Sequence, residues 1–242
     1  MVEHFFFHPR PNNPLYKEQW KEFELLLNLN RENLQGWLVK AEDFQNAPCI
    51  IYFGGNAEDV SVNLSYLNLP LSRSILLMNY RGFGSSSGKP TQEGLFCDAL
   101  AITDHVLNEM HIKSNQLILI GRSIGSSIAA YVASQRSIEK LILITPFDKI
   151  QSVAPKWLLA PFRCVLKKYF TTTDYLKDYR GDTLVIAAEH DELIPKESLL
   201  SLIEQMPKQP AFVEIKSADH QNIQDFPEYH SVIEQFISGS KV

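Results

Sequence analysis

Gly121-Arg122-Ser123-Ile124-Gly125 is the stretch that decides how this chain folds. An apolar run, Leu117 to Ile120, comes directly before it, and a helix-prone run from Ser126 to Gln135 follows. A strand that turns sharply into a helix at G-x-S-x-G lifts the serine oxygen out of the sheet edge. The two glycines let strand and helix crowd around the turn without a Cβ clash. The pattern therefore predicts that Ser123 sits on a tight strand-to-helix turn.

Strand-like runs alternate with helical runs along the rest of the chain. Phe23 to Leu29 and Leu34 to Val39 flank a short polar turn and predict an antiparallel hairpin. The later runs are almost continuously apolar, which is typical of parallel strands covered on both faces. These runs are Cys49–Phe53, Ile75–Tyr80, Leu117–Ile120, Leu141–Thr145, Thr183–Ala188 and Ala211–Ile215. Helices are predicted at 93–111, 124–134, 196–206 and 227–237. The alternation predicts an α/β fold with a mostly parallel central sheet flanked by helices.

The 242 residues are consistent with one domain, 1–242, in which residues 1–21 form an N-terminal extension. Residues 146–182 break the alternation, because they contain no clear strand and are longer than an ordinary connection. Their apolar side chains, with Trp157 and Phe162 foremost, predict a small helical cap that contacts the substrate. The alternative is an ordinary long helix with its loops.

Composition excludes several classes of function. The net charge is −5 and no basic cluster is present, which argues against a nucleic-acid partner. The apolar runs are too short for a transmembrane segment, and Phe5-Phe6-Phe7 lacks the flanks of a signal peptide. We therefore expect a cytoplasmic protein, with its oligomeric state open. Cys49, Cys97 and Cys164 form no C-x-x-C, so we expect three buried, reduced thiols and no metal site.

Ser123 requires a base to activate it and an acid to orient that base. Asp191 follows the predicted strand 183–188, and His220 follows the predicted strand 211–215. Both lie just past the carboxyl end of a parallel strand, where open α/β sheets place their sites. We predict Ser123 as nucleophile, His220 as base and Asp191 as acid. The alternatives for the acid are Glu189, Glu192 and Asp148, and the alternative for Ser123 is a plain helix cap.

A serine nucleophile also needs two N–H donors for the oxyanion of its intermediate. The residue after the nucleophile, Ile124, supplies one. The loop Gly54-Gly55-Asn56-Ala57 follows the strand 49–53, and its glycines allow a close approach to substrate. We predict the Asn56 N–H as second donor, with Ala57 as runner-up, and Gly55 and Ala57 as substrate contacts. Alternatively, Gly54-Gly55 only forms a strand-to-helix turn.

Three blocks of sequence, Tyr52 to Asp59, Asn79 to Gly88 and Gly121 to Gly125, together resemble one protein family. They look like the small α/β-hydrolase-domain serine hydrolases, which include protein depalmitoylases, with related patterns in monoacylglycerol lipases and bacterial esterases. The resemblance covers roughly residues 22–238, and Tyr80-Arg81-Gly82-Phe83-Gly84 is its most specific piece. In the family this piece supports the site rather than reacting. Gly54 stands where the family usually has a histidine.

The resemblance implies the α/β-hydrolase fold and a serine hydrolase that cleaves carboxylic esters or thioesters through an acyl-enzyme. The implied triad is Ser123, His220 and Asp191, with no metal and no cofactor. The implied partner is a small acyl ester or thioester, or an acylated protein. Two alternatives stay open at this point: a catalytically silent binding module with the same fold, and a small serine peptidase.

Overall fold

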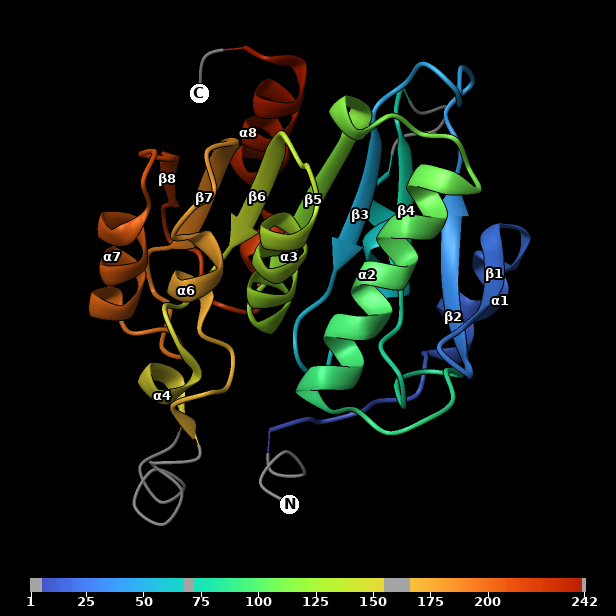
Figure 1. Ribbon diagram of the computed structural model, residues 1–242, viewed down its shortest axis with the longest axis horizontal. Helices are drawn as coiled ribbons and strands as arrows, with labels where there is room; N and C mark the ends of the chain where they lie inside the picture. Colours follow the sequence, from blue (N-terminus) through green and yellow to red (C-terminus); the bar gives the residue numbers. More distant parts are fainter. Residues whose placement is uncertain (1–5, 68–71, 155–165, 241–242) are drawn as a thin grey trace. The chain divides into compact units, whose positions relative to one another are not determined.

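A computed structural model describes residues 6–67, 72–154 and 166–240 of the chain. The chain divides into two units, Met1–Leu119 and Ile120–Val242 (Figure 1). Each unit combines β-strands with helices that pack on them. The prediction of one domain over the whole length stays a prediction.

The first unit begins with the predicted antiparallel hairpin. Strands β1 (Glu24–Leu29) and β2 (Glu32–Val39) pair so that Glu24 faces Trp37 and Leu29 faces Glu32. Strand β4 (Ser74–Met78) pairs antiparallel with β2 and parallel with β3 (Cys49–Phe53). The strand order in this unit is therefore β1-β2-β4-β3. Every residue of β3 and β4 is buried, as their continuous apolar runs predict.

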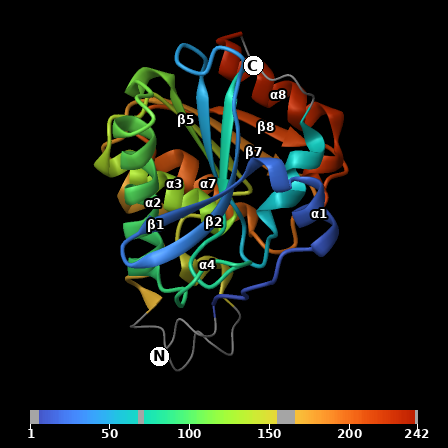
Figure 2. The same cartoon turned by 90° about the vertical axis from the view of Figure 1, so that its right-hand side faces the viewer.

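Helices cover both faces of the first unit's strands, with α1 (Pro14–Gln19) and α2 (Gln92–Asn108) on opposite sides (Figure 2). Helix α2 begins where the Thr91 hydroxyl accepts a hydrogen bond from the Gly94 N–H at 3.0 Å. Arg81, predicted to support the site, binds Asp98 on this helix. Its guanidinium binds both oxygens of the buried Asp98 carboxylate at 2.7 and 2.6 Å, so it ties the 81–88 loop to α2.

The second unit carries parallel strands, as predicted from their apolar runs. Strands β6 (Lys140–Ile144), β7 (Asp182–Ala188) and β8 (Ala211–Ile215) pair in parallel, and β5 (Leu117–Arg122) leads into the unit. Helix α3 (Ile124–Gln135) packs against β6, and α8 (Pro227–Ser238) packs against β8. Figure 2 shows α3 and α8 on opposite faces of these strands. Helix α7 (Lys196–Gln205) connects β7 to β8 along the chain.

The predicted cap segment, 146–182, is described only in part. It contains the short helices α4 (Ile150–Val153) and α6 (Thr172–Leu176), and a single β-bridge joins Lys149 to Thr171. Helix α6 packs against α3. Residues 155–165, which include the predicted substrate contacts Trp157 and Phe162, lie outside the described residues. The cap and both contacts therefore stay predictions.

The prediction of three buried thiols is wrong for Cys97. This residue lies on the solvent-facing side of α2 and is exposed, because the apolar stripe of that helix runs through Leu95, Ala99 and Ile102 instead. Cys49, in β3, is fully buried, and burial raises the pKa of its thiol to about 12. Cys164 lies outside the described residues.

We expect iodoacetamide to alkylate Cys97 and to leave Cys49 unmodified in the native protein. The thiolate is the reacting form, and Cys49 has neither solvent access nor a thiolate at neutral pH. Peptide mass spectrometry after native labelling measures this, and labelling in urea, where both thiols react, is the control. Native alkylation of Cys49 as fast as that of Cys97 would contradict the burial of β3.

Candidate active site

The G-x-S-x-G stretch folds as the sharp strand-to-helix turn that its sequence predicts. Ser123 follows the last residue of β5 and precedes the first residue of α3, with a φ of 52° that non-glycine residues seldom adopt. Its N–H donates to the carbonyl of Ile144 at the end of β6, at 2.9 Å. The surrounding structure thus maintains a strained backbone at Ser123, as is common at functional positions.

Gly121 is required by the closeness of the helix to the strand. A Cβ at this position would lie 2.3 Å from the carbonyl oxygen of Gly125 and 2.6 Å from the Cα of Ser126. No side chain fits there, because both neighbours are backbone atoms of the first turn of α3. The glycine therefore permits the tight turn that holds Ser123.

His220 and Asp191 form a hydrogen-bonded pair in the second unit. Nδ1 of His220 lies 2.8 Å from Oδ2 of Asp191, and the side chains are only 12% and 9% exposed. The other carboxylate oxygen, Oδ1, accepts the N–H groups of Leu193 and Ile194 at 2.9 Å each. Asp191 is thereby fixed by its own loop. Because its carboxylate binds Nδ1 of the His220 ring, Nε2 is the ring nitrogen that points away from Asp191. This is the arrangement that a histidine base needs.

The other carboxylates considered for the acid have different partners. Asp148 is buried after β6, where it accepts the Ser198 hydroxyl and the Lys149 N–H. Glu189 accepts the Ser217 N–H and binds Lys216, and the Ser217 hydrogen bond is the main cause that lowers its pKa. Glu192 is exposed. Asp191 is therefore the carboxylate of this set that is hydrogen-bonded to His220.

Arg122, the second residue of the motif, contacts the backbone of the His220 loop. Its Nη2 donates to the carbonyl of His220 at 2.9 Å and to that of Gln221 at 3.2 Å, and the residue is 9% exposed. Sequence reasoning missed this contact. The available signal was a charged side chain at the end of an apolar strand, because a buried arginine requires partners.

In the first unit, Glu58 organises the loop predicted to supply the second oxyanion donor. Its carboxylate accepts the Tyr52 hydroxyl at 2.7 Å, the Gly55 N–H at 2.5 Å and the Asn63 amide at 2.7 Å. On the other side of the loop, the Tyr80 hydroxyl donates to the Gly54 carbonyl at 2.7 Å. Burial, with a smaller effect from Glu58, raises the pKa of Tyr80, so this hydroxyl stays protonated. These contacts hold the loop although Gly54 replaces the family's histidine.

The predicted oxyanion and substrate residues are placed as follows. The side chain of Asn56 binds the N-terminal segment. Its Nδ2 donates to the Phe6 carbonyl, and its Oδ1 accepts the His8 N–H. Ala57, beside it, has a positive φ of 65°. Ile124 is buried at the start of α3. Asn56 and Ile124 belong to different units, and their joint use as donors stays a prediction.

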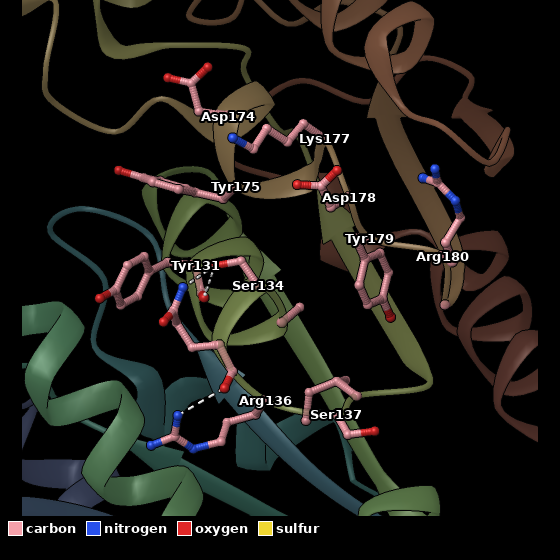
Figure 3. Close-up of a pocket in the computed structure, with 14 residues that line it drawn as sticks. Tyr131, Ser134, Arg136, Ser137, Asp174, Tyr175, Lys177, Asp178, Tyr179 and Arg180 are labelled. Carbon is pink, nitrogen blue, oxygen red and sulfur yellow. Dashed lines mark hydrogen bonds between the residues drawn. The ribbon is translucent and has the colours of Figure 1, made fainter.

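Of two cavities in the second unit, one lies beside Asp191 and the other lies away from the predicted site residues. A small one of about 50 Å³ lies beside Asp191 and is lined by the ends of β6 and β7, including Thr145 and Ala188. A larger hollow of about 520 Å³ lies between the C-terminal end of α3 and residues 174–181 (Figure 3). Its lining is rich in charged and tyrosine side chains, such as Arg136 and Tyr175, and contains none of the predicted site residues. The strand ends around Asp191 are therefore the better candidate for chemistry.

Across 6–67, 72–154 and 166–240, no group of three or more His, Cys, Asp or Glu side chains is arranged to hold a metal ion. In the same ranges, no helix is both long and apolar enough to cross a membrane.

A family model, a curated relative and a solved structure that resemble this chain all point to α/β hydrolases. A family model described as alpha/beta hydrolase fold matches residues 48–163. The alpha/beta hydrolase domain-containing protein 17B of Homo sapiens is 28% identical over 202 residues, which are 80% of this chain and 67% of that protein. The Pyrococcus furiosus esterase Pf2001 has a TM-score of 0.74 at 18% identity, covering 97% of this chain and 99% of that one. These matches support an α/β-hydrolase group, and the likeness to the solved structure shows the α/β-hydrolase fold.

The chain also resembles an uncharacterized protein of Mycobacterium tuberculosis. The two are 29% identical over 167 residues, which are 67% of this chain. The chain matches about three fifths of that relative's length, at 59%. The predicted fold, a mostly parallel sheet with flanking helices, is confirmed by these comparisons and by the strands described above.

Proposed function

We propose that this α/β-hydrolase is a serine hydrolase that cleaves carboxylic esters or thioesters through an acyl-enzyme. One observation carries the proposal. The unit that holds Ser123 on its strained turn also holds a histidine–carboxylate pair joined at 2.8 Å. A nucleophile, a base and an orienting acid in chain order Ser, Asp, His are the parts that acyl transfer needs in this fold.

In the proposed reaction, the Ser123 Oγ attacks the acyl carbon while Nε2 of His220 takes its proton. Asp191 holds the ring and stabilises the imidazolium that forms. The N–H groups of Ile124 and Asn56 bind the oxyanion of the tetrahedral intermediate. The intermediate collapses, and the alcohol or thiol leaves with the proton from His220. Water then attacks the acyl-enzyme by the same route, which releases the acid and restores Ser123.

The substrate class follows from the chemistry and from the named relatives. The Pyrococcus furiosus protein is an esterase, and ester cleavage needs the same catalytic groups as thioester cleavage. We propose a small acyl ester or thioester, or an acylated protein, as the substrate. The apolar residues of 146–182, including Trp157 and Phe162, are proposed to bind the acyl group. Gly55 and Ala57 are proposed to contact the reacting carbonyl.

We expect kcat/KM on p-nitrophenyl esters to rise with acyl length from acetyl and then stop rising. Each added CH₂ that enters an apolar pocket contributes about 0.8 kcal/mol, or roughly fourfold in kcat/KM, until the pocket is full. Steady-state kinetics on esters and matching thioesters measure this, and p-nitrophenyl phosphate and a peptide p-nitroanilide are the control substrates. Turnover of none of the acyl substrates would refute the proposed function. Faster cleavage of the anilide would favour the peptidase.

A further inference from the structure

Arg122 joins the nucleophile strand to the backbone of the base. It is the last residue of β5 and directly precedes Ser123 in the chain. Its guanidinium donates to two consecutive carbonyls, those of His220 and Gln221. The planar, permanently charged guanidinium suits several acceptors at once, and a buried arginine is retained where its donors are used.

The His220 loop is internally rigid, so that a single anchor can position it. Oδ1 of Asp219 accepts the N–H groups of Gln221 and Asn222 at 2.7 and 2.9 Å, and Oδ1 of Asn222 accepts the Asp219 N–H at 2.8 Å. The two backbone hydrogen bonds are the main causes that lower the pKa of Asp219, with smaller effects from His220 and Arg122. The carboxylate therefore stays charged and keeps the turn closed at neutral pH.

The imidazole of His220 is thus held from two directions. Asp191 binds the ring at Nδ1, which fixes its rotation and tautomer. Asp191 does not fix the backbone of residue 220, because its hydrogen bond ends at the ring. The Arg122 contact supplies that second anchor and connects it to the strand from which the serine turn begins. A movement of this loop would shift Nε2 relative to Ser123.

We propose that Arg122 is a positioning residue, which sets the distance and direction of His220 toward Ser123 by holding the carbonyls of His220 and Gln221. This inference rests on the proposed function, because it assigns Arg122 a role in proton transfer. In this role Arg122 forms no covalent bond with the substrate, and the role needs no cofactor. Its effect falls on kcat, since a base displaced by about 1 Å costs on the order of 10²-fold in rate.

The test compares Arg122→Met, Arg122→Lys and the control Arg180→Met. Methionine keeps much of the apolar stem and removes every donor, whereas lysine restores one charged donor. Arg180 lies in the same unit, is exposed and lines the larger hollow (Figure 3), so its loss reports a general charge effect. The measurements are kcat and KM on a p-nitrophenyl ester, the thermal unfolding midpoint, and the proton NMR signal of the His220 Nδ1–H.

We expect Arg122→Met to lower kcat by about 10²-fold, with KM within twofold of wild type. Arg122→Lys recovers part of the loss, and Arg180→Met is unchanged. The NMR signal of the Nδ1–H shifts or broadens in Arg122→Met only, because the ring then no longer sits in one position. A variant that merely loosened the fold would lower the unfolding midpoint and leave the Nδ1–H signal of its folded fraction unchanged.

Three results would overturn the inference. The first is a kcat of Arg122→Met within twofold of wild type. The second is an equal loss in Arg180→Met, and the third is an unchanged Nδ1–H signal. If Arg122→Met does not fold, Arg122→Lys tests the inference instead. We then expect a kcat of Arg122→Lys below that of wild type, and a kcat equal to wild type would contradict the inference. If wild type cleaves no acyl substrate, the proposed function fails, and the NMR comparison still judges the positioning of His220.

Discussion

Ser123→Ala is expected to abolish turnover of every acyl substrate while leaving the fold intact. In a triad, loss of the serine costs about 10⁶-fold in kcat, and what remains comes from the oxyanion site and from binding. Alanine has no hydroxyl to attack with, yet it tolerates the same backbone about as well as serine. The measurement is kcat on a p-nitrophenyl ester together with the thermal unfolding midpoint.

Ser134→Ala is the matched control for this substitution. Ser134 lies on the same helix, α3, and its hydroxyl is exposed and hydrogen-bonded to the Tyr131 carbonyl. It should retain wild-type kcat. A fluorophosphonate probe should label wild type and Ser134→Ala at Ser123, and should not label Ser123→Ala. If Ser123→Ala kept more than a few per cent of the activity, the nucleophile would have been assigned wrongly.

The central strands could be predicted from sequence because their apolar runs are uninterrupted. Strand β3 coincides with its predicted run, and β6 ends one residue before the predicted end, at Ile144. Strand β8 also coincides with its predicted run, although it is the last strand in the sheet order, Glu214 interrupts its apolar residues and it is only partly buried. The predicted end of β4, at Tyr80, is two residues too late, because the strand ends at Met78. Tyr80 is buried like a strand residue, but its hydroxyl binds the Gly54 carbonyl in a loop. Burial alone does not distinguish a strand from a buried loop.

The candidate site was predictable where chain order carries the information. The fold fixes the sequence Ser, acid, His, and strand ends fix where the three residues lie, so Asp191 and His220 could be selected and are hydrogen-bonded to each other. The partner of Arg122 could not be selected, since it lies 98 residues away and no spacing rule links the two. Glu58 was missed because the family's loop is anchored by histidine, and a substitute anchor is visible only in its contacts with Tyr52, Gly55 and Asn63.

Asp191→Asn is expected to lower kcat by about 10⁴-fold, with little change in KM. The reason lies in the two N–H donors that face Oδ1. Leu193 and Ile194 require an oxygen there, so the amide oxygen must take that position and the NH₂ group must turn toward His220. Nδ1 then accepts a hydrogen bond, and the proton of the neutral ring moves to Nε2. In that tautomer Nε2 cannot take the proton of Ser123.

Asp148→Asn separates this effect from the loss of any buried carboxylate near the strand ends. Asp148 is buried, and its carboxylate accepts the Ser198 hydroxyl and the Lys149 N–H. Its amide variant should lower the unfolding midpoint and keep kcat within a few fold of wild type. Asp191→Asn should do the reverse, because its loop donors remain satisfied while the tautomer of His220 is wrong. A larger fall in kcat for Asp148→Asn would move the acid to the end of β6, and His220 would then need a different orientation from the one that Asp191 and Arg122 hold.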